Sequence, residues 1–507
     1  MKKIDNQLRM GAVLSYINLG LSSLIPFLYT PVMLKMLGQS EYGLYSLSMT
    51  VISYLSLLTF GFGGTIVRYI TMYRAAGEKQ KEEEIIGFFL GLYCVIAIAI
   101  MIIGNILSNN VDSIFSQGLT LAEQNKMQIL MPILTFNSAL SLPVSVFVSV
   151  TMAHERYIFR RVVDILMTVG MPIMNLIALY MGYASIGLAL SSTIIQILML
   201  PINAGYCFKK LNVRIRFSKL PKELIKEIVG FSLFVFIGTI VDMLFWATDK
   251  VILGMLTSTA VIAVYNIGST FNSMITSLST SLSSILTPRI TTMVIQGAEK
   301  KQLTDIFIRI GRIQYYVVIL AISGFAVFGQ DFIYLWTGPA YQDAYWIALV
   351  TLVPLSIPLI QNTGLSILMA QNKHSFRSIS YLIIAILNVI STYLIVPYFG
   401  GIGAAVCSGV SYIVGQGIIM NIYYYMVIHI NIVDFWKNIL KISIVPLSMS
   451  VGSIVIKQFI DINSWHRFLT FVIMYTLIYM VLIYRFSMNK YEKEMCQGFV
   501  AKIVRKK

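Results

Sequence analysis

The segment Ile165–Phe208 reads ILMTVGMPIMNLIALYMGYASIGLALSSTIIQILMLPINAGYCF and contains no Asp, Glu, Lys or Arg. A helix needs about 20 mostly apolar residues to cross a bilayer. This segment is long enough for two such helices, and Gly182-Tyr183-Ala184-Ser185 offers a turn between them. It therefore predicts a helical hairpin inside a membrane.

The composition of the whole chain agrees with that hairpin. Of the 507 residues, 57% are hydrophobic and only 12% are charged, whereas about 25% are charged in a typical soluble domain. The mean hydropathy is +0.78. Four widely spaced cysteines without a Cys-x-x-Cys motif argue against a disulfide framework or a zinc site. The chain is expected to be an all-α integral membrane protein.

Twelve further spans are predicted from apolar stretches, which gives about 14 transmembrane helices. Ser378–Val433 is long enough for two of them, divided near Pro397–Gly401. The remaining stretches are Met10–Leu34, Tyr42–Val67, Ile85–Val111, Met127–Ala153, Ile228–Thr248, Val251–Pro288, Ile306–Phe328, Ala344–Met369, Ile439–Ile460 and Phe468–Tyr484.

The distribution of basic residues predicts the orientation of these helices. Loops on the cytoplasmic side of a membrane carry an excess of Lys and Arg. With the N-terminus in the cytoplasm, 33 of the 38 Lys and Arg residues fall in cytoplasmic segments and five in external ones. Both termini are therefore expected in the cytoplasm. The formal charge of +16 then reflects topology and attraction to membrane lipids, and we expect no nucleic-acid partner.

The two halves of the chain share a weak repeat at an offset close to 219 residues. The paired positions are Val32 with Val251, Arg68 with Arg289, Met152 with Met369, Asn175 with Asn388 and Ile186 with Ile402. Six helices per repeat predict two lobes related by a pseudo-two-fold axis along the membrane normal. The expected parts are an N-terminal lobe (1–208), a basic cytoplasmic linker (209–227), a C-terminal lobe (228–433), and helices 13 and 14 with a basic tail (434–507).

Several short motifs resemble those of lipid-linked O-antigen and capsular polysaccharide flippases. They are Leu14-Ser15-Tyr16-Ile17-Asn18, Tyr29-Thr30-Pro31, Met36-Leu37-Gly38-Gln39-Ser40-Glu41-Tyr42-Gly43-Leu44-Tyr45, Gly61-Phe62-Gly63 and Gly400-Gly401-Ile402-Gly403-Ala404-Ala405. The likeness covers nearly the whole chain. It points to the polysaccharide branch of the multidrug/oligosaccharidyl-lipid/polysaccharide exporter superfamily.

This resemblance implies a cargo and a place in the cell. The cargo would be an undecaprenyl-pyrophosphate-linked glycan, which moves by alternating access to the outer leaflet of the bacterial plasma membrane. It would serve O-antigen, capsule or exopolysaccharide synthesis, alongside a polysaccharide polymerase and glycosyltransferases. No cofactor is expected, although coupling to an H⁺ or Na⁺ gradient stays open.

Arg68 and Arg289 are the residues expected to bind the pyrophosphate. They are equivalent positions of the repeat, at the predicted cytoplasmic ends of helices 2 and 8. A guanidinium fork binds two phosphate oxygens at once, which suits a pyrophosphate. The resemblance adds that these helices border the cleft in the superfamily. The competing interpretation is that both arginines only anchor the helix ends at the membrane surface.

Hydroxyl and amide side chains at helical spacing are candidates to line the cleft and bind sugars. On helix 2 they are Ser46, Thr50 and Ser53, and on helix 8 they are Ser269, Asn272, Thr276, Ser279 and Ser283. Small polar residues are also common where membrane helices pack together. Both interpretations stay open from the sequence.

Asp242 and Asp164 are the acids predicted deepest within spans, and they are the candidates for ion coupling. An acid in a membrane is costly and by default suggests function. Asp164 follows Arg160 and Arg161, so simple ion pairing is the alternative for this residue. No metal site is expected.

Two other functions fit parts of the sequence. A cation-coupled drug exporter of the same superfamily would share the two lobes. A membrane polymerase or glycosyltransferase acting on lipid-linked sugars would need charged external loops, and those loops are short here. Neither an Asp-x-Asp motif nor a phosphate-binding Gly-x4-Gly-Lys-Ser/Thr loop occurs. We therefore expect a transporter and not an enzyme.

Overall fold

The computed structural model of the chain describes residues 2–218 and 221–504, and its regular elements over these residues are all helices. Lys219 of the predicted basic linker and Arg505–Lys507 of the basic tail lie outside these residues. Eleven of the described helices are long and apolar enough to cross a membrane. The prediction of an all-helical membrane protein is confirmed.

Contacts between residues divide the chain into two compact units, Met1–Ala263 and Val264–Lys507. The helix α11 begins in the first unit and continues into the second. The helices that begin in the first unit are α1 (Lys2–Leu37), α2 (Gln39–Tyr54), the 3-10 turn η1 (Leu55–Thr59), α3 (Phe62–Ala75), α4 (Lys79–Asn109), α5 (Val111–Ile114), α6 (Leu121–Ala153), α7 (Tyr157–Tyr180), α8 (Ala184–Lys210), α9 (Lys222–Trp246), α10 (Thr248–Leu256) and α11 (Thr259–Ile295).

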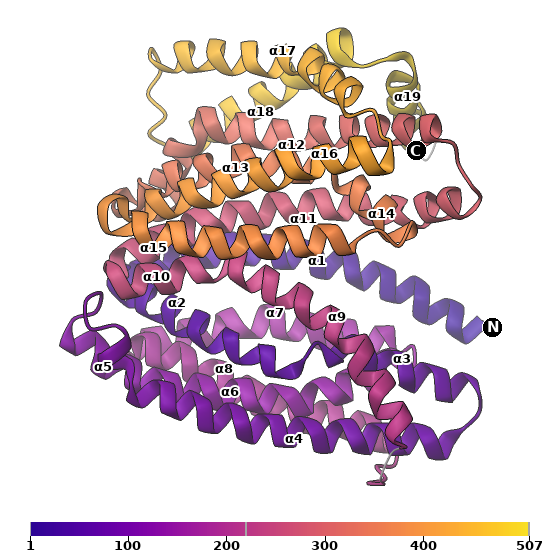
Figure 1. Ribbon diagram of the computed structural model, residues 1–507. Coiled ribbons are helices and arrows are strands. Elements are labelled where there is room, and N and C mark those ends of the chain that lie inside the picture. The colour runs from indigo at the N-terminus through magenta and orange to yellow at the C-terminus, as the bar shows by residue number, and fades with distance from the viewer. Residues whose placement is uncertain (1, 219–220, 505–507) are drawn as a thin grey trace. The chain divides into compact units, whose positions relative to one another are not determined.

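The helix α6 forms the centre of the first unit. It packs between α4 and α8, which run beside it (Figure 1), and it also contacts α2 and α3. Gly104 on α4 permits a close approach, because a β-carbon there would lie 2.4 Å from the side chain of Thr135 on α6. The predicted turn between α7 and α8 is present, and Gly182 adopts the left-handed conformation in it (φ 83°).

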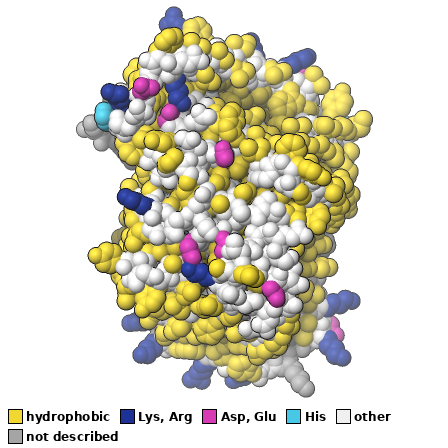
Figure 2. All heavy atoms as spheres, turned by 90° about the vertical axis from the view of Figure 1, so that its left-hand side faces the viewer, with side chains coloured by type: hydrophobic (Ala, Val, Ile, Leu, Met, Phe, Trp, Pro, Cys, Tyr) yellow, Lys and Arg dark blue, Asp and Glu magenta, His cyan; other side chains and the backbone are white. Residues whose placement is uncertain are grey.

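Large apolar side chains remain exposed along the outer helices. Ile98, Ile102 and Ile106 follow each other one turn apart on α4, and each is more than half exposed. An exposed apolar row like this one on α4 is unfavourable in water and suits contact with lipid chains. Figure 2 looks at the helix ends that lie on the left of Figure 1, where hydrophobic and uncharged groups make up most of the surface.

The second unit contains the remaining helices and three π-helical stretches. They are α12 (Lys300–Thr337), the 3-10 turn η2 (Pro339–Tyr341), α13 (Ala344–Ile360), α14 (Asn362–Ala370), α15 (Ser375–Tyr412), the π-helical η3 (Ile413–Met420), α16 (Asn421–Tyr423), the π-helical η4 (Tyr424–Ile428), α17 (Ile432–Lys457), α18 (Trp465–Leu482), the π-helical η5 (Ile483–Ser487) and α19 (Lys490–Val504).

The long helical segment Ser375–Ile428 folds back on itself at Gly400, whose φ of 53° and ψ of −138° are not helical. Tyr381 Oη donates to Gln416 Oε1 over 2.7 Å, and Asn388 Nδ2 donates to Ser408 Oγ over 3.4 Å. Both pairs are nearly centred on the same turn, as in an antiparallel hairpin. The predicted division of this stretch near Pro397–Gly401 is therefore correct.

A buried ion pair fastens the C-terminal helix α19 to the second unit. Arg312 on α12 donates from Nε to Glu492 Oε1 (2.6 Å) and from Nη2 to Glu492 Oε2 (2.8 Å). Tyr316 Oη also donates to Glu492 Oε2 (3.0 Å), and Arg312 Nη2 reaches Ser487 O (3.0 Å). Only 6% of Arg312 and 1% of Glu492 are exposed. Both charges are thus removed from solvent and satisfied by each other.

The ion pair controls the titration of Glu492. Burial alone raises the pKa of this carboxyl, but the hydrogen bonds from Arg312 and from the backbone N–H of Asn489 outweigh it and lower the pKa below its ordinary value. A carboxyl whose pKa is lowered by folding stabilises the folded state at pH values above its ordinary pKa of about 4.3. That stabilisation is lost as the pH falls through the lowered pKa, so it is constant near neutral pH.

We predict that Glu492→Gln releases α19 and lowers thermal stability. Removing one partner of a buried ion pair leaves an uncompensated charge, which typically costs about 3–5 kcal/mol. The measurements are the unfolding midpoint in detergent and the rate of tryptic cleavage after Lys490 and Lys493. Glu494→Gln is the matched control, because this carboxyl is exposed on the same helix. Equal cleavage rates for the two variants at pH 7 would contradict the prediction.

Candidate functional site

The predicted second span is not one helix but is broken between α2 and α3. The turn η1 ends at Phe60 and Gly61, which both adopt the left-handed conformation (φ 48° and 69°). Glycine tolerates this conformation at little cost, which explains why α3 can begin at Phe62. Beside the break, the hydroxyls of Tyr54 and Thr248 lie 2.6 Å apart. The absence of charge over Tyr42–Val67 could not predict this interruption.

Arg68 lies in the middle of α3, and its side chain is exposed. Its guanidinium carbon is 5.9 Å from the ring centroid of the buried Tyr69. The second arginine of the predicted pair, Arg289, is also exposed, on α11 in the second unit. Each arginine therefore lies at the surface of its own unit.

The predicted polar residues of α2 mostly donate hydrogen bonds to backbone carbonyls of their own helix. Ser46 and Thr50 are buried, and Ser53 is half-buried. Thr50 Oγ1 donates to Ser46 O (2.8 Å), and Ser53 Oγ donates to Thr50 O (2.7 Å). Back-bonding of this kind lets a hydroxyl lie in an apolar environment without an external partner.

On α11, the predicted polar residues hold neighbouring helices of the second unit. Asn272 Oδ1 accepts from Thr351 Oγ1 on α13 (3.0 Å), and Ser279 Oγ donates to Leu359 O (2.9 Å). Ser283 is hydrogen-bonded to Gln314 on α12. These contacts are what the packing interpretation expects. The two other members of the predicted set, Ser269 and Thr276, are half-buried.

A different group of hydroxyls on α11 is exposed. Its members lie at helical spacing on one side of α11, and they are Ser273, Ser277, Thr280 and Ser281. We call these four residues the exposed α11 stripe. Composition alone could not separate this stripe from the buried one, because both consist of Ser and Thr at helical spacing, and only packing fixes how the helix is rotated.

The two acids predicted within spans have different surroundings in the structure. Asp164 on α7 is paired with Arg160 Nη2 (2.7 Å) and Arg161 Nη1 (3.2 Å), and 15% of its side chain is exposed. The pairing alternative thus describes its surroundings. Asp242 on α9 is exposed.

A third acid, Asp249, is more deeply buried than either and was missed by the sequence analysis. It is 2% exposed and lies in the first turn of α10, directly after the break at Ala247. Lys250 follows it in the chain. Adjacent acidic and basic residues between two apolar stretches were the available signal, but this pattern is also typical of a loop.

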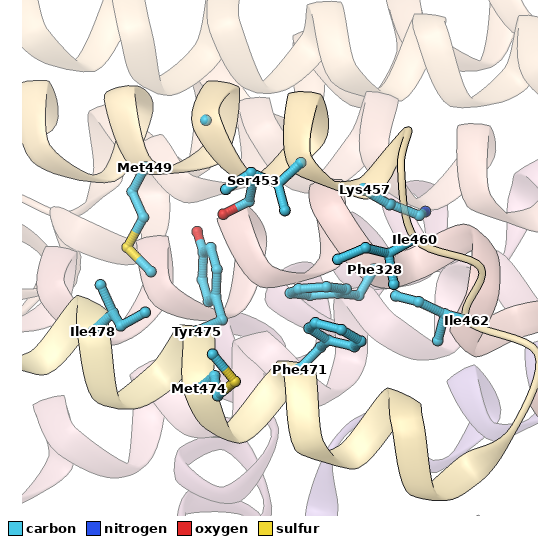
Figure 3. Close-up of a pocket in the computed structure, with 12 residues that line it drawn as sticks. Phe328, Met449, Ser453, Lys457, Ile460, Ile462, Phe471, Met474, Tyr475 and Ile478 are labelled. Atoms are coloured by element: carbon cyan, nitrogen blue, oxygen red, sulfur yellow. The ribbon is translucent and has the colours of Figure 1, made fainter.

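An apolar groove separates α17 from α18 in the second unit, and Figure 3 shows Phe328 of α12 between them. It has a volume of about 270 Å³ and is lined mainly by Met, Ile, Phe and Tyr side chains. Lys457 lies at one end, where it pairs with Asp331 (2.6 Å). The lining suits a hydrocarbon chain and offers too few polar groups for a sugar or a pyrophosphate.

No group of three or more His, Cys, Asp or Glu side chains in residues 2–218 and 221–504 is arranged to hold a metal ion. The four cysteines are free thiols, and Cys94 is exposed.

Comparison with protein families gives one match that covers more than half of the chain. A model of the family described as polysaccharide biosynthesis protein matches residues 9–294. No curated protein matches the sequence significantly.

Solved structures with a similar fold include a flippase and two transporters that are described as members of the MOP superfamily. A lipid II flippase, MurJ, in an inward closed conformation has a TM-score of 0.73 at 16% identity, over 94% of this chain and 98% of that one. An inward-facing multidrug resistance MATE transporter of the MOP superfamily has a TM-score of 0.58 at 16% identity, over 79% and 96%. A MOP superfamily transporter from Pyrococcus furiosus has a TM-score of 0.54 at 15% identity, over 82% and 94%.

We predict that the exposed α11 stripe, and not the buried set, faces water. In a cysteine-free background, Ser277→Cys should react with a charged, membrane-impermeant thiol reagent, and Ser279→Cys should react only after denaturation. Ile98→Cys on the apolar face of α4 is the control for a lipid-facing position, where a charged reagent cannot enter. Labelling of Ser279→Cys as fast as that of Ser277→Cys would show that the assignment of the two faces is wrong.

Proposed function

Because the chain belongs to the polysaccharide biosynthesis protein family, we propose that it is a flippase for undecaprenyl-pyrophosphate-linked oligosaccharide repeat units. It has the fold of MOP superfamily transporters and is not an enzyme. The cargo would cross the bacterial plasma membrane by alternating access and serve O-antigen, capsule or exopolysaccharide synthesis. The family match carries this proposal, and the fold likeness to a lipid II flippase supports it.

The proposed topology has 14 spans and both termini in the cytoplasm. Eleven helices meet the length and composition of a span, and one of them, Ser375–Ile428, is a hairpin that supplies two. The helices α9 and α11 would supply the other two. A pseudo-two-fold axis relating two six-helix lobes is supported by the offset repeat in the sequence.

Arg68 and Arg289 are proposed to bind the pyrophosphate at the inward mouth. A sugar headgroup with two phosphates needs hydrogen bonds and positive charge to leave water. Both arginines are exposed, so an anion can reach them. Ser273, Ser277, Thr280 and Ser281 offer hydroxyls on the same helix as Arg289, and we propose that this stripe binds sugar hydroxyls.

The energy source is proposed to be an ion gradient that acts through Asp242. Asp164 is a poorer candidate, because two arginines already neutralise it. Asp242 is exposed and can exchange an ion with its surroundings. Multidrug export driven by the same kind of gradient is the second candidate function, since a MATE transporter shares the fold.

The flippase proposal predicts that Arg68→Ala and Arg289→Ala each reduce flipping about tenfold or more, with a larger loss in the double variant. A hydrogen bond to a charged group is worth about 1.5–3 kcal/mol, which corresponds to at least one factor of ten. The assay is reconstituted vesicles that contain a fluorescent polyprenyl-pyrophosphate-linked N-acetylglucosamine, with quenching from outside. Arg309→Ala is the control, because this guanidinium stacks on Tyr491 at 4.1 Å.

Arginine-to-lysine variants sharpen this test. Arg68→Lys and Arg289→Lys keep the charge but lose the fork, so they should recover only part of the activity. Full flipping by the double alanine variant at a normal protein level would refute the role of both arginines. Transport of a cationic dye with no movement of the lipid-linked sugar would favour the drug-export alternative.

Ion coupling makes a separate prediction. In vesicles with an imposed H⁺ or Na⁺ gradient, Asp242→Asn should flip lipid-linked sugar at a rate that no longer responds to the gradient, whereas Asp112→Asn should keep the response. Asp112 is the control because it lies in the short helix α5. A gradient response of normal size in Asp242→Asn would exclude this residue as the ion carrier.

A further inference from the structure

Three connections of the first unit meet at a small polar pocket. It is formed by the turn between α3 and α4, the turn between α6 and α7, and the chain that leaves α8. Its lining includes Arg74, Glu82, Glu83, His154 and Asn212. The segment that leaves α8 is held closely, since Arg216 N donates to Glu83 O (3.3 Å) and a β-carbon on Gly87 would lie 2.2 Å from Arg216 O.

His154 is fixed between two oxygen atoms in this pocket. Its Nδ1 lies 3.0 Å from Val150 O, and its Nε2 lies 3.3 Å from Glu82 Oε1. Only 11% of the histidine side chain and 10% of the glutamate side chain are exposed. Water therefore has little access to the contact between them.

The oxygens of Val150 and Glu82 determine how many protons His154 and Glu82 must hold together for both contacts to be favourable. A carbonyl oxygen only accepts, so Nδ1 must carry a hydrogen. A neutral ring would then direct the lone pair of Nε2 at the carboxylate, and two acceptors in contact repel each other. One additional proton, on either Nε2 or the carboxyl, removes the repulsion. The arrangement is therefore satisfied only when the pair holds one proton more than a neutral histidine and an ionised glutamate do.

The surrounding charges mostly oppose this proton. Arg74 from α3, Lys79 from the start of α4 and Arg156 from the turn after α6 are the nearby cations, and Glu83 from α4 is the nearby anion. The chain that leaves α8 contributes only Leu211, Asn212 and Val213. Burial lowers the pKa of the His154 imidazole, and Arg74 and Arg156 lower it further. The imidazole alone would thus be neutral at pH 7.

We propose that Glu82 and His154 form a proton-binding site, in which a single exchangeable proton shared between Nε2 and the carboxyl joins the α3–α4 turn to the α6–α7 turn. Arg74 connects the same two turns, because its Nη1 donates to Ala153 O (2.8 Å). Loss of the proton leaves the hydrogen bond between Arg74 and Ala153 in place between the two turns. Arg74 lies on the same helix, α3, as Arg68, so the proton joins the α6–α7 turn to the end of the helix that carries Arg68.

The test follows the four histidines by solid-state nuclear magnetic resonance with ¹⁵N-labelled histidine, using the full chain in lipid nanodiscs. The His154 signals are assigned by their loss in His154→Gln. Between pH 5.5 and 8.5, Nδ1 should stay protonated and Nε2 should gain and lose the proton. In Glu82→Gln the midpoint of this titration should fall by about one pH unit or more, because a carboxylate in contact favours the charged ring by that amount.

Glu84→Gln is the matched control, since this carboxyl is two residues further on α4 and bonds to Gln80. It should move the midpoint by less than about 0.3 pH unit. Equal midpoints in the wild type and Glu82→Gln, or an equal shift in Glu84→Gln, would overturn the proposal. Titration of Nδ1 instead of Nε2 in the wild type would overturn it too, and that measurement needs no variant beyond the one used for the assignment. The titration requires no cargo, so its outcome is independent of whether the chain flips lipid-linked sugars.

Discussion

A helix in hydrocarbon must satisfy its own backbone hydrogen bonds, because lipid offers neither donors nor acceptors. This constraint explains where the interior polar side chains lie. The hydroxyl of Thr50 returns its hydrogen to a carbonyl one turn earlier in the same helix, and that of Ser283 does the same. Other polar contacts within a unit lie beside helix interruptions, where freed backbone groups also need partners.

Within each unit, two interruptions meet. In the first unit, the break between α2 and α3 contacts the break between α9 and α10 through Tyr54 and Thr248. In the second unit, Gln361 at the α13–α14 break accepts from Gln416 Nε2 (2.7 Å), which lies in the π-helical η3. Discontinuous helices and π-helical turns are frequent at functional sites of transporters. Such breaks are candidate positions for bending within a unit, because intact helices resist bending.

The sequence was sufficient to predict the features that follow from the preference of apolar side chains for lipid over water, which are the long helices and the turns between them. Long runs without charge identified the apolar helices, and glycines marked the turns at Gly182 and Gly400 correctly. Hydropathy carries no information on backbone conformation, so Phe60–Gly61 was read as the interior of one span. It is equally insensitive to how a helix is rotated, which is why the exposed α11 stripe and the buried Asp249 emerged only from packing.

Arginine is more informative than serine in such a protein. A serine hydroxyl can be satisfied by its own helix, so its presence in a span says little about function. A guanidinium has five donors in a fixed fork, and its own helix cannot satisfy them. Arg312 illustrates the requirement, because its burial needs Glu492, Tyr316 and the carbonyl of Ser487 together. Arg68 in the middle of α3 and Arg289 on α11 are both exposed, so a phosphate can reach their guanidinium groups, and this is the physical reason for the proposal that the anionic part of a cargo binds beside them.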